Sequence, residues 1–600
     1  MTRVTDSGLA GQLAQCQAAE LIRRVQAEPE LEYWFRHALV QEAAYESLLK
    51  TTRAELHGKV AAAIEESAMD RREANAAVLA LHYERAGLGA KAFPYAVTAA
   101  NRARDTYAHR EAVAFYDMAL AMAEKAGDPA MAGDARMIYV HRGRVLEVAG
   151  DHPGAQANYR AMLDSARRSG ALAMQAEALN HLVTVQIVGG GRAPDLSRNL
   201  EEAAALAHQS GEPILEGRAL WNMGLYNRFR DPPAAVEYLQ QTLELARSAD
   251  PEDVPMRELA ANALIDLSVS YIMSGELRQA LSSRQQAAAY YRELDNLPLL
   301  ADALGGLALI LYFFGETTQS RAYAQEGARI SQATDNPWGA VYNGWAPHEL
   351  HIDAGEFEAA LDKSTRHLEM AHKVGFPVFM GVLLAQIARV RLELGQFDLA
   401  TQFADQASKE FSTMGARSWT TWGRGVAAGA RIASGDIAGA RELLEPMWQP
   451  GDNPVGSMQG LIVAGPEIAA WSAADGRLEH GLAFCDWILG HIEPEGAWRF
   501  VGQMLYERGK ILQRLGDSLQ AEADLLRARK LLENSGALIL IWRVNAALAE
   551  IYADTGQGDR ALAARGQARA EIGHLADGIR DDSLRRSFLN HPEVQRVLGA

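Results

Sequence analysis

A glycine recurs about every 40 residues through the second half of this chain of 600 residues. It stands in short turn-like stretches such as SGELRQAL (274–281) and AGEFEAAL (354–361). The recurring glycines are Gly275, Gly315, Gly355, Gly395, Gly435, Gly476, Gly516 and Gly556. The same register extends backward to Gly150, Gly190, Arg230 and a turn near Arg110. A fixed period of this length indicates stacked supersecondary units, each of which contacts its neighbours.

Each unit is expected to be a pair of helices joined by the glycine turn. Glycine suits the left-handed position just past a helix end, and proline, frequent in the links between units, suits a helix start. Small residues flank the turn, which allows two antiparallel helices to approach closely. Five residues after the glycine stand Ala280, Ser320, Ala360, Ala400, Ala440, Gly481, Ala521 and Ala561.

This pattern resembles the tetratricopeptide repeat over about residues 74–575. Its period of about 40 residues exceeds the usual 34 and matches HEAT or armadillo units of about 40–47. The glycine turn with paired small positions nevertheless favours the tetratricopeptide type with longer helices. The resemblance implies an all-α fold, a right-handed superhelical solenoid of about 12 helix-turn-helix units. We assign 71–575 to this solenoid and 576–600 to a C-terminal capping helix.

Composition restricts the partners of the chain. The formal net charge of −17 opposes binding to nucleic acid and to anionic membranes. Two distant cysteines, Cys16 and Cys485, form neither a disulfide framework nor a metal knuckle. The N-terminus lacks the apolar core of a signal peptide, and no window approaches 18 uninterrupted apolar residues. We therefore expect a soluble, cytoplasmic protein that binds neither nucleic acid nor membrane.

The stretch WFRHALVQEAAYESLL (34–49), with the helix-like run that follows it, resembles a boundary segment in large multidomain regulators. There it ends a helical or winged-helix module that follows a STAND-type ATPase and precedes a tetratricopeptide array. Some of these regulators begin with a class III nucleotide cyclase, and others end with a LuxR-type DNA-binding domain. The matching residues are Phe35, Arg36, His37, Ala38, Leu39, Ala44, Tyr45, Leu48, Leu49, Leu56 and His57.

The resemblance implies that residues 1–70 correspond to the end of such a winged-helix or ATPase-associated module. The chain carries no G-x-x-x-x-G-K-[ST] loop that would cradle a nucleotide's phosphates. It therefore looks like the sensor part of such a regulator, with an ATPase or cyclase domain as a possible partner in cis or in trans.

Two local motifs could be taken for an anion site and a metal site, but a plain turn and ordinary helix residues explain them better. VGGGRAPDLS (188–197) lies in register with the inter-helix turns, and no lysine follows it, so a turn is expected rather than an anion site. HELHID (348–353) places His348 and His351 on one helix without the H-E-x-x-H spacing of a catalytic zinc site. No G-x-S-x-G motif is present either. We expect no enzyme activity, no cofactor and no metal.

The inner helix of each unit carries the candidate recognition surface. Aromatic, Arg, Gln and Glu side chains recur 13, 10, 6, 3 and 2 residues before the turn glycine, a mixture that suits a ligand groove. The alternative is that the Trp and Tyr rings pack as core between repeats. The predicted binding residues are Tyr312, Tyr342, Asn343, Trp345, His348, Glu349, Arg389, Trp422, Gln503, Tyr506 and Arg543.

One unit breaks the pattern. In NPWGAVYNGWAPHELHI (336–352) two glycines and Pro347 fall where a helix interior is expected, and Pro347 should kink the helix. Such an irregularity favours a functional site, and the repair of a packing irregularity is the alternative. The sequence thus predicts a non-enzymatic scaffold that senses a protein or small-molecule ligand on its concave face, or alternatively a stand-alone protein-interaction adaptor.

Overall fold

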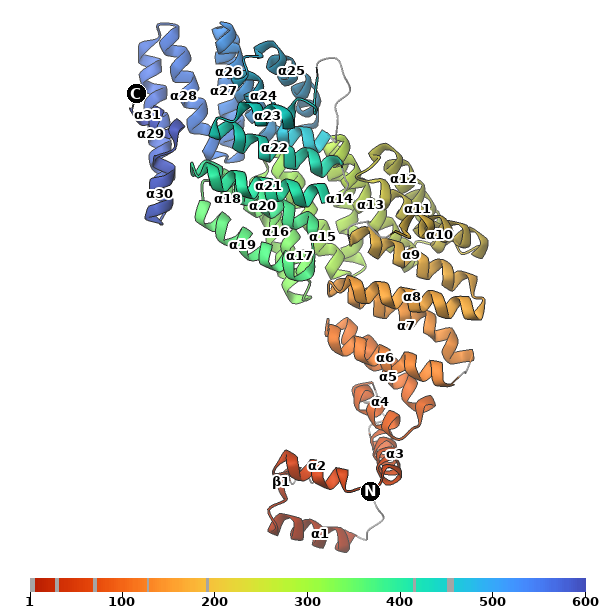
Figure 1. Ribbon diagram of the computed structural model, residues 1–600. Helices are drawn as coiled ribbons and strands as arrows, with labels where there is room; N and C mark the ends of the chain where they lie inside the picture. Colours follow the sequence, from red (N-terminus) through yellow and green to blue (C-terminus); the bar gives the residue numbers. More distant parts are fainter. Residues whose placement is uncertain are drawn as a thin grey trace. The chain divides into compact units, whose positions relative to one another are not determined.

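The computed structural model describes residues 6–26, 32–67, 73–126, 129–189, 194–413, 417–449 and 458–599 (Figure 1). The chain divides into two compact units, Met1–Leu146 and Glu147–Ala600. The expected turn at Gly190 and most of the glycine-rich part of 188–197 lie outside the described residues.

The smaller unit begins with a short antiparallel hairpin of strands among helices. Ile22 pairs with Phe35 and Arg23 with Trp34, so the all-helical expectation misses these two strands. Its elements are α1 (Asp6–Ala18), β1 (Ile22–Gln26), β2 (Glu32–Phe35), α2 (Ala38–Glu46), α3 (Lys50–Ser67), α4 (Ala76–Arg85), α5 (Gly89–Asp105), α6 (His109–Ala126) and most of α7 (Pro129–Val148).

The core of the smaller unit is built mainly from alanine. Helices α4, α5 and α6 pack in succession, and α3 packs on α4. Ala80, Ala96 and Ala112 are fully buried there beside larger side chains such as Tyr83 and Tyr116. Because α3 and α4 lie in one compact unit, the boundary expected at residue 70 falls inside that unit.

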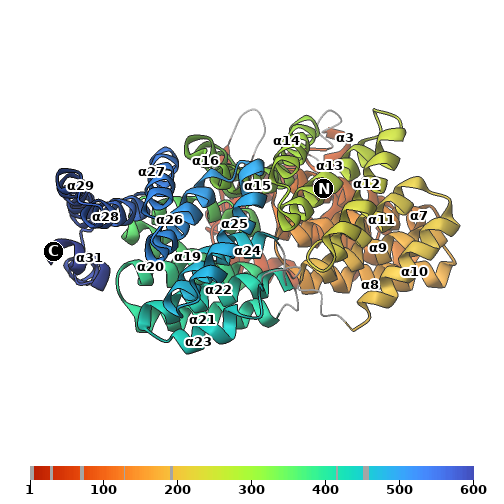
Figure 2. The same ribbon diagram turned by 90° about the horizontal axis from the view of Figure 1, so that it is seen from above.

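The larger unit is an all-α solenoid of tetratricopeptide-type hairpins, seen from two directions in Figures 1 and 2. Its first helices are α8 (His152–Ser169), α9 (Leu172–Val188), α10 (Leu196–Ser210), α11 (Pro213–Asn227), α12 (Pro232–Ser248), α13 (Val254–Ser274), α14 (Leu277–Glu293), α15 (Leu297–Phe314) and α16 (Thr317–Ala333). The middle helices are α17 (Pro337–Tyr342), α18 (Trp345–Asp353), α19 (Phe357–Val374), α20 (Pro377–Glu393), α21 (Phe397–Thr413), α22 (Arg417–Ser434) and α23 (Ile437–Leu444). The last are α24 (Met458–Ala474), α25 (Leu478–Glu495), α26 (Trp498–Leu515), α27 (Ser518–Ser535), α28 (Leu538–Asp554), α29 (Gly558–Gly578), α30 (Asp582–Leu589) and α31 (Pro592–Gly599).

The predicted repeat matches the helix order. Over the described residues, twelve helix pairs run from α5–α6 to α28–α29 when α17 and α18 count as one broken helix. The eight turn glycines from Gly275 to Gly556 all have positive φ, as the left-handed turn position requires. The small residues after the turn are buried, with Ala280, Ala360 and Ala400 fully inaccessible. The 40-residue period therefore predicted both the turns and the close contacts.

The irregular unit contains a broken first helix. Helix α17 ends at Tyr342 and α18 begins at Trp345, so the break falls at Asn343 and Gly344, just before Pro347. Pro347 lies in the first turn of α18, where its missing N–H costs little. The Asn343 Nδ2 group donates to the carbonyls of Ala301 (3.0 Å) and Gly339 (2.8 Å), which ties the break to the preceding repeat.

First helices of distant hairpins also meet inside the larger unit. Helix α15 contacts α26, α13 contacts α24, and α18 contacts α28. The two helices of each pair are separated by about five repeats in sequence. First helices of distant repeats therefore pack against each other across the inside of the solenoid. Helix α15 is long and apolar enough to cross a membrane, but most of it is buried among these helices, as in the core of a folded unit.

The C-terminal end differs from the expected single capping helix. Helix α29 extends to Gly578, and the residues after it form two short helices, α30 and α31. Both helices contact α29, and Phe588 and Val594 are buried. Asp581 caps α30 by accepting hydrogen bonds from the N–H groups of Ser583 and Leu584, which explains the restart.

Candidate functional site

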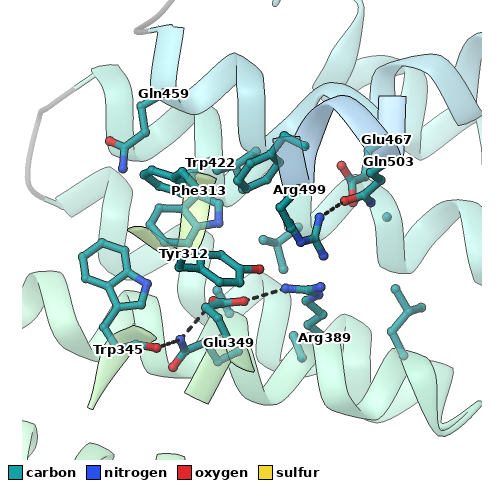
Figure 3. A pocket seen from close by; sticks show the side chains of 18 of the residues that line it. Tyr312, Phe313, Trp345, Glu349, Arg389, Trp422, Gln459, Glu467, Arg499 and Gln503 are labelled. Atoms are coloured by element: carbon teal, nitrogen blue, oxygen red, sulfur yellow. Dashed lines mark hydrogen bonds and ion pairs between the residues drawn. The ribbon is translucent and has the colours of Figure 1, made fainter. Parts of the chain in front are cut away.

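A cavity of about 100 Å³ lies where six first helices converge: α15, α18, α20, α22, α24 and α26 (Figure 3). Its floor is made of small residues on α20 and α22, among them Ala388, Gly429 and Ala430. The repeat geometry explains this placement, because residues at equal distances from successive turn glycines face the same side. The cavity is thus a product of the stacking rather than of one hairpin.

One side of the cavity is aromatic. The rings of Trp345 and Trp422 stack with centroids 5.4 Å apart, and Phe313 lies 5.4 Å from Phe500. Trp345 and Trp422 are only 6% and 7% exposed. The rings therefore pack as core, as one alternative expected, and they also form a cavity wall (Figure 3), while the binding role of these tryptophans stays a prediction.

On the other side, the lining residues Arg389 and Arg499 are held by a buried carboxylate behind them, Asp353. It accepts two hydrogen bonds from Arg499 (2.9 and 2.8 Å), one from Arg389 (2.7 Å) and one from the Tyr312 hydroxyl (3.1 Å). Burial alone would raise the pKa of Asp353, but the two guanidinium groups outweigh it and hold that pKa at about 2. Because Asp353 and Arg499 are 146 residues apart, this ion pair joins two distant hairpins.

A second carboxylate completes the network. Arg389 donates to Glu349 (2.5 Å), and the Gln386 amide donates to the same carboxylate (3.0 Å). The Gln386 carbonyl in turn lies 3.1 Å from Nδ1 of His348. Burial, together with the nearby His367 ring, lowers the pKa of His348 to about 3, so this imidazole is neutral at pH 7.

Glu467 on α24 lines the same cavity. Its Oε2 atom is buried and has no hydrogen-bond partner. Burial raises the pKa of Glu467 to about 7, although Arg389 and Arg499 act in the opposite direction. Gly429 leaves room for this side chain, since a Cβ there would lie 3.1 Å from the Glu467 Cγ. The cavity therefore contains one acidic group whose bonding is incomplete.

Six of the eleven predicted binding residues line the cavity. They are Tyr312, Trp345, Glu349, Arg389, Trp422 and Gln503. Their role in binding a ligand stays a prediction.

The other five lie elsewhere. Tyr342 and Asn343 are packed against the preceding repeat, with the Tyr342 hydroxyl 3.4 Å from Arg284. His348 lies behind Gln386 and is fully buried. Tyr506 and Arg543 lie outside the cavity lining, where Lys510 stacks on Tyr506 and Arg543 pairs with two glutamates.

Sequence reasoning missed several lining residues. Gln386 and Glu467 stand nine residues before their turn glycines, on the same helical face as the positions 13 and six residues before, so this register could have been included. Arg499, Phe500 and Gln459 stand 16 or 17 residues before the glycine, at the start of their helices. Only the close approach of α26 to α15 brings Arg499 to Asp353.

The two histidines of the HELHID stretch do not converge. His348 contacts Gln386, whereas His351 pairs with Glu356 and lies 2.7 Å from the Lys363 ammonium. Within the part of the chain that the structure describes, no group of three or more His, Cys, Asp or Glu side chains gathers as a metal site requires. A metal reading of this stretch has no geometric support.

Comparison with known proteins gives no family. No family model matches the chain, and no curated protein matches it. Among solved structures, a Rap protein complexed with competence and sporulation factor matches 68% of this chain and 99% of its own, at 12% identity and a TM-score of 0.38. The APC/C hetero-tetramer Cut9–Hcn1 matches 84% of this chain and 95% of its own, at 11% identity and a TM-score of 0.43.

Yeast Tom70 matches 75% of this chain and 96% of its own, at 15% identity and a TM-score of 0.33. Similarities at this level carry no argument about what the chain binds. The fold assignment rests on the helical hairpins and their glycine turns.

Proposed function

We propose that this protein is a non-enzymatic recognition module that binds a ligand in the cavity between its inner helices. The observation that carries the proposal is the convergence of six first helices on one cavity with an aromatic side and a hydrogen-bonded charged side. Such cavities fix the orientation of a ligand with a few polar groups and supply contact area with rings. In this proposal the inner face is the concave, ligand-binding face of the solenoid.

The same cavity offers a way to transmit binding. The cavity wall includes both α15 and α26. These helices are about 200 residues apart in sequence but are in contact. A ligand that contacts both would favour one spacing between them, and small changes between neighbouring repeats add up along a solenoid. This supports a sensing role.

We further propose that the module is the sensing arm of a STAND-ATPase or class III cyclase-type regulator in the cytoplasm. The segment 34–57 supports this, because it carries the resemblance and because Phe35, Leu39 and Leu49 are exposed apolar residues in it. Exposed apolar side chains gathered in one short segment are typical of contact surfaces. An ATPase or cyclase domain, in cis or in trans, would cover them.

The proposal is tested by affinity capture with the full chain. The protein is immobilised, exposed to a lysate of its own host, and the recovered proteins and small molecules are identified by mass spectrometry. Val463→Phe, which fills the cavity, is compared with Val254→Phe, the same change at an exposed site on α13. We expect a ligand that is lost with Val463→Phe and kept with Val254→Phe.

A ligand retained by both variants would place the binding site outside the cavity. Recovery of nothing beyond what blank resin retains would contradict the recognition function itself.

A further inference from the structure

The cavity contains an acidic group that the protein itself does not satisfy. The Glu467 Oε2 atom is buried without a partner, while the other carboxylates of the site are fully engaged. A buried polar atom without a hydrogen bond costs about 1–3 kcal/mol, so a ligand that donates to it removes that cost. Glu467 is therefore the group that selects the polar end of a ligand.

The arginines of the site are not available for an anion. Arg499 directs Nε and one terminal nitrogen to Asp353 and the other to Gln503. Arg389 divides its two terminal nitrogens between Glu349 and Asp353. An anionic ligand would have to break one of these buried pairs, which typically costs about 3–5 kcal/mol.

The charge balance of the site points the same way. Two guanidinium groups face three carboxylates, those of Glu349, Asp353 and Glu467, so an ionised Glu467 leaves one unbalanced negative charge. Glu507 adds to the negative charge near Glu467, although Lys510 pairs with it at 3.0 Å. Burial raises the pKa of Glu467 to about 7, and the charges of Arg389 and Arg499 do not offset this effect.

The remaining wall requires an apolar body on the ligand. Trp345, Trp422, Phe313 and Phe500 supply rings, and ring faces also attract cations. The cavity volume of about 100 Å³, at about 10–15 Å³ for each water-sized position, holds roughly seven to ten non-hydrogen atoms. This is the size of a small metabolite rather than of a folded polypeptide segment.

We propose that the cavity binds a small organic ammonium ion, with the charged nitrogen on the Glu467 carboxylate and the apolar body against the aromatic side of the cavity. The inference rests on the proposed recognition function and adds the chemical class of the ligand. It assigns to Glu467 the role of the specificity-determining residue of the site.

A matched set of three probes tests the charge requirement on the full chain. Phenethylamine is cationic at neutral pH, phenethyl alcohol is its neutral analogue of the same size, and phenylacetate is the anionic counterpart. Binding is measured by isothermal titration calorimetry at pH 8, where Glu467 is mostly ionised. We expect the amine to bind at least about tenfold more tightly than the alcohol, and the carboxylate to bind no better than the alcohol.

Two variants test the residue. Glu467→Gln keeps the shape and removes the charge, and it should reduce amine affinity at least about tenfold while leaving alcohol binding unchanged. Glu479→Gln makes the same charge change at an exposed position of α25 and should alter neither. Circular dichroism of each variant checks that it is folded. If a variant does not fold, the comparison of the three probes on the unsubstituted protein still tests the charge requirement.

Equal binding of amine and alcohol, preference for the carboxylate, an unaffected Glu467→Gln variant, or no binding of any probe would each overturn this inference. These results leave the proposed function standing, because that function is judged by capture from lysate with Val463→Phe. Capture of a ligand that depends on the cavity but carries no cation would likewise overturn only the ammonium assignment.

Discussion

Two regions of this protein bury very different fractions of their residues. In the N-terminal segment, residues 6–67, Ala61 is the only buried residue among those whose burial the structure describes. The pocket helices, α15, α18, α20, α22, α24 and α26, are by contrast mostly buried, and α15 alone buries 13 of its 18 residues. A helix in a repeat array gains its stability from neighbours on both sides, whereas among the described residues of the N-terminal segment only α3 packs on a repeat helix, α4.

The comparison predicts where substitutions matter. Changes in the pocket helices should break buried ion pairs and tight packing. Comparable changes in the N-terminal segment should affect contacts with other molecules rather than the stability of the chain.

The largest effect is expected for Asp353→Asn. This change leaves Arg499 and Arg389 without their shared buried carboxylate, and removal of one partner from such a network costs about 3–5 kcal/mol. The rate of amide hydrogen exchange in α18 and α26 should rise by roughly 10²-fold to 5 × 10³-fold. Asp362→Asn, at an exposed pair with Arg366, is the control and should change exchange by less than about threefold. Equal effects of the two substitutions would contradict the buried network.

A smaller effect is expected for Gly327→Ala on α16. An added Cβ would lie 1.9 Å from the Asn343 Oδ1 atom, so the broken helix must shift, at a cost of about 1–3 kcal/mol. In the N-terminal segment, Gly11→Ala meets no atom within 4 Å and should stabilise α1 by about 0.5–1 kcal/mol. The effect of Gly327→Ala is measured by urea unfolding followed by circular dichroism. The effect of Gly11→Ala is measured by amide hydrogen exchange in α1. We expect Gly327→Ala to lower stability and Gly11→Ala to raise it. If Gly327→Ala leaves the free energy of unfolding unchanged, the packing at Asn343 is loose.

Acidification should weaken the pocket helices through His348. Burial holds its folded-state pKa at about 3, below the ordinary value of 6.5, so the unfolded chain binds a proton that the folded protein does not. Its contribution is therefore lost as pH falls below about 6.5, by at most about 1.4 kcal/mol per pH unit down to about pH 3. His367, His351 and Lys363 lie around this ring and also disfavour its charge.

The measurement is the urea midpoint at pH 7 and pH 5. His348→Gln should reduce the difference between the two pH values, whereas His208→Gln at an exposed site should leave it unchanged. In the smaller unit, His57 and His82 face each other at 2.8 Å, and burial lowers the pKa of both. These two histidines are far less buried than His348, so replacing either by Gln should change the pH dependence of the urea midpoint less than His348→Gln does. A larger change would contradict the view that acidification acts mainly through the pocket helices.

The smallest effect on stability is expected for Leu39→Ser and Leu49→Ser. These side chains are 78% and 75% exposed, so both changes should alter the free energy of unfolding by less than about 0.5 kcal/mol. The same substitution at the buried Leu304 of α15 should unfold the helices around it. Thermal unfolding monitored by circular dichroism distinguishes the cases. Destabilisation by Leu39→Ser as strong as that by Leu304→Ser would show that the N-terminal segment has a core of its own.

Much of the fold follows from local chemistry, and this part was predictable. Gly275 and Gly315 adopt positive φ because only glycine accepts that turn geometry at little cost, so their spacing alone located the hairpins. The break near Pro347 was equally visible, since proline cannot donate the helical hydrogen bond. The strands β1 and β2 were missed because they are short and include charged residues such as Arg23 and Arg24.

The candidate site was predictable only in part. Tyr312, Trp345, Glu349, Arg389, Trp422 and Gln503 were found because their positions relative to a turn glycine specify which helical face they occupy. Asn343 and His348 lie outside the lining because they stand 12 and seven residues before Gly355, outside the registers that face the cavity, and their side chains contact Gly339 and Gln386 instead. Glu467 was missed because the predicted registers omit the position nine residues before the turn glycine, and no residue near it in sequence indicates that its carboxyl is buried.

The sequence by itself determined the repeat, the turns and the small residues that let paired helices approach, because each depends on residues within one 40-residue unit. The tertiary structure alone decided that α15 meets α26, and with it the Asp353–Arg499 pair and the cavity next to Glu467. The physical reason is that small rotations between neighbouring repeats accumulate over five units. The meeting of distant helices is therefore set by the sum of many interfaces and by no local motif.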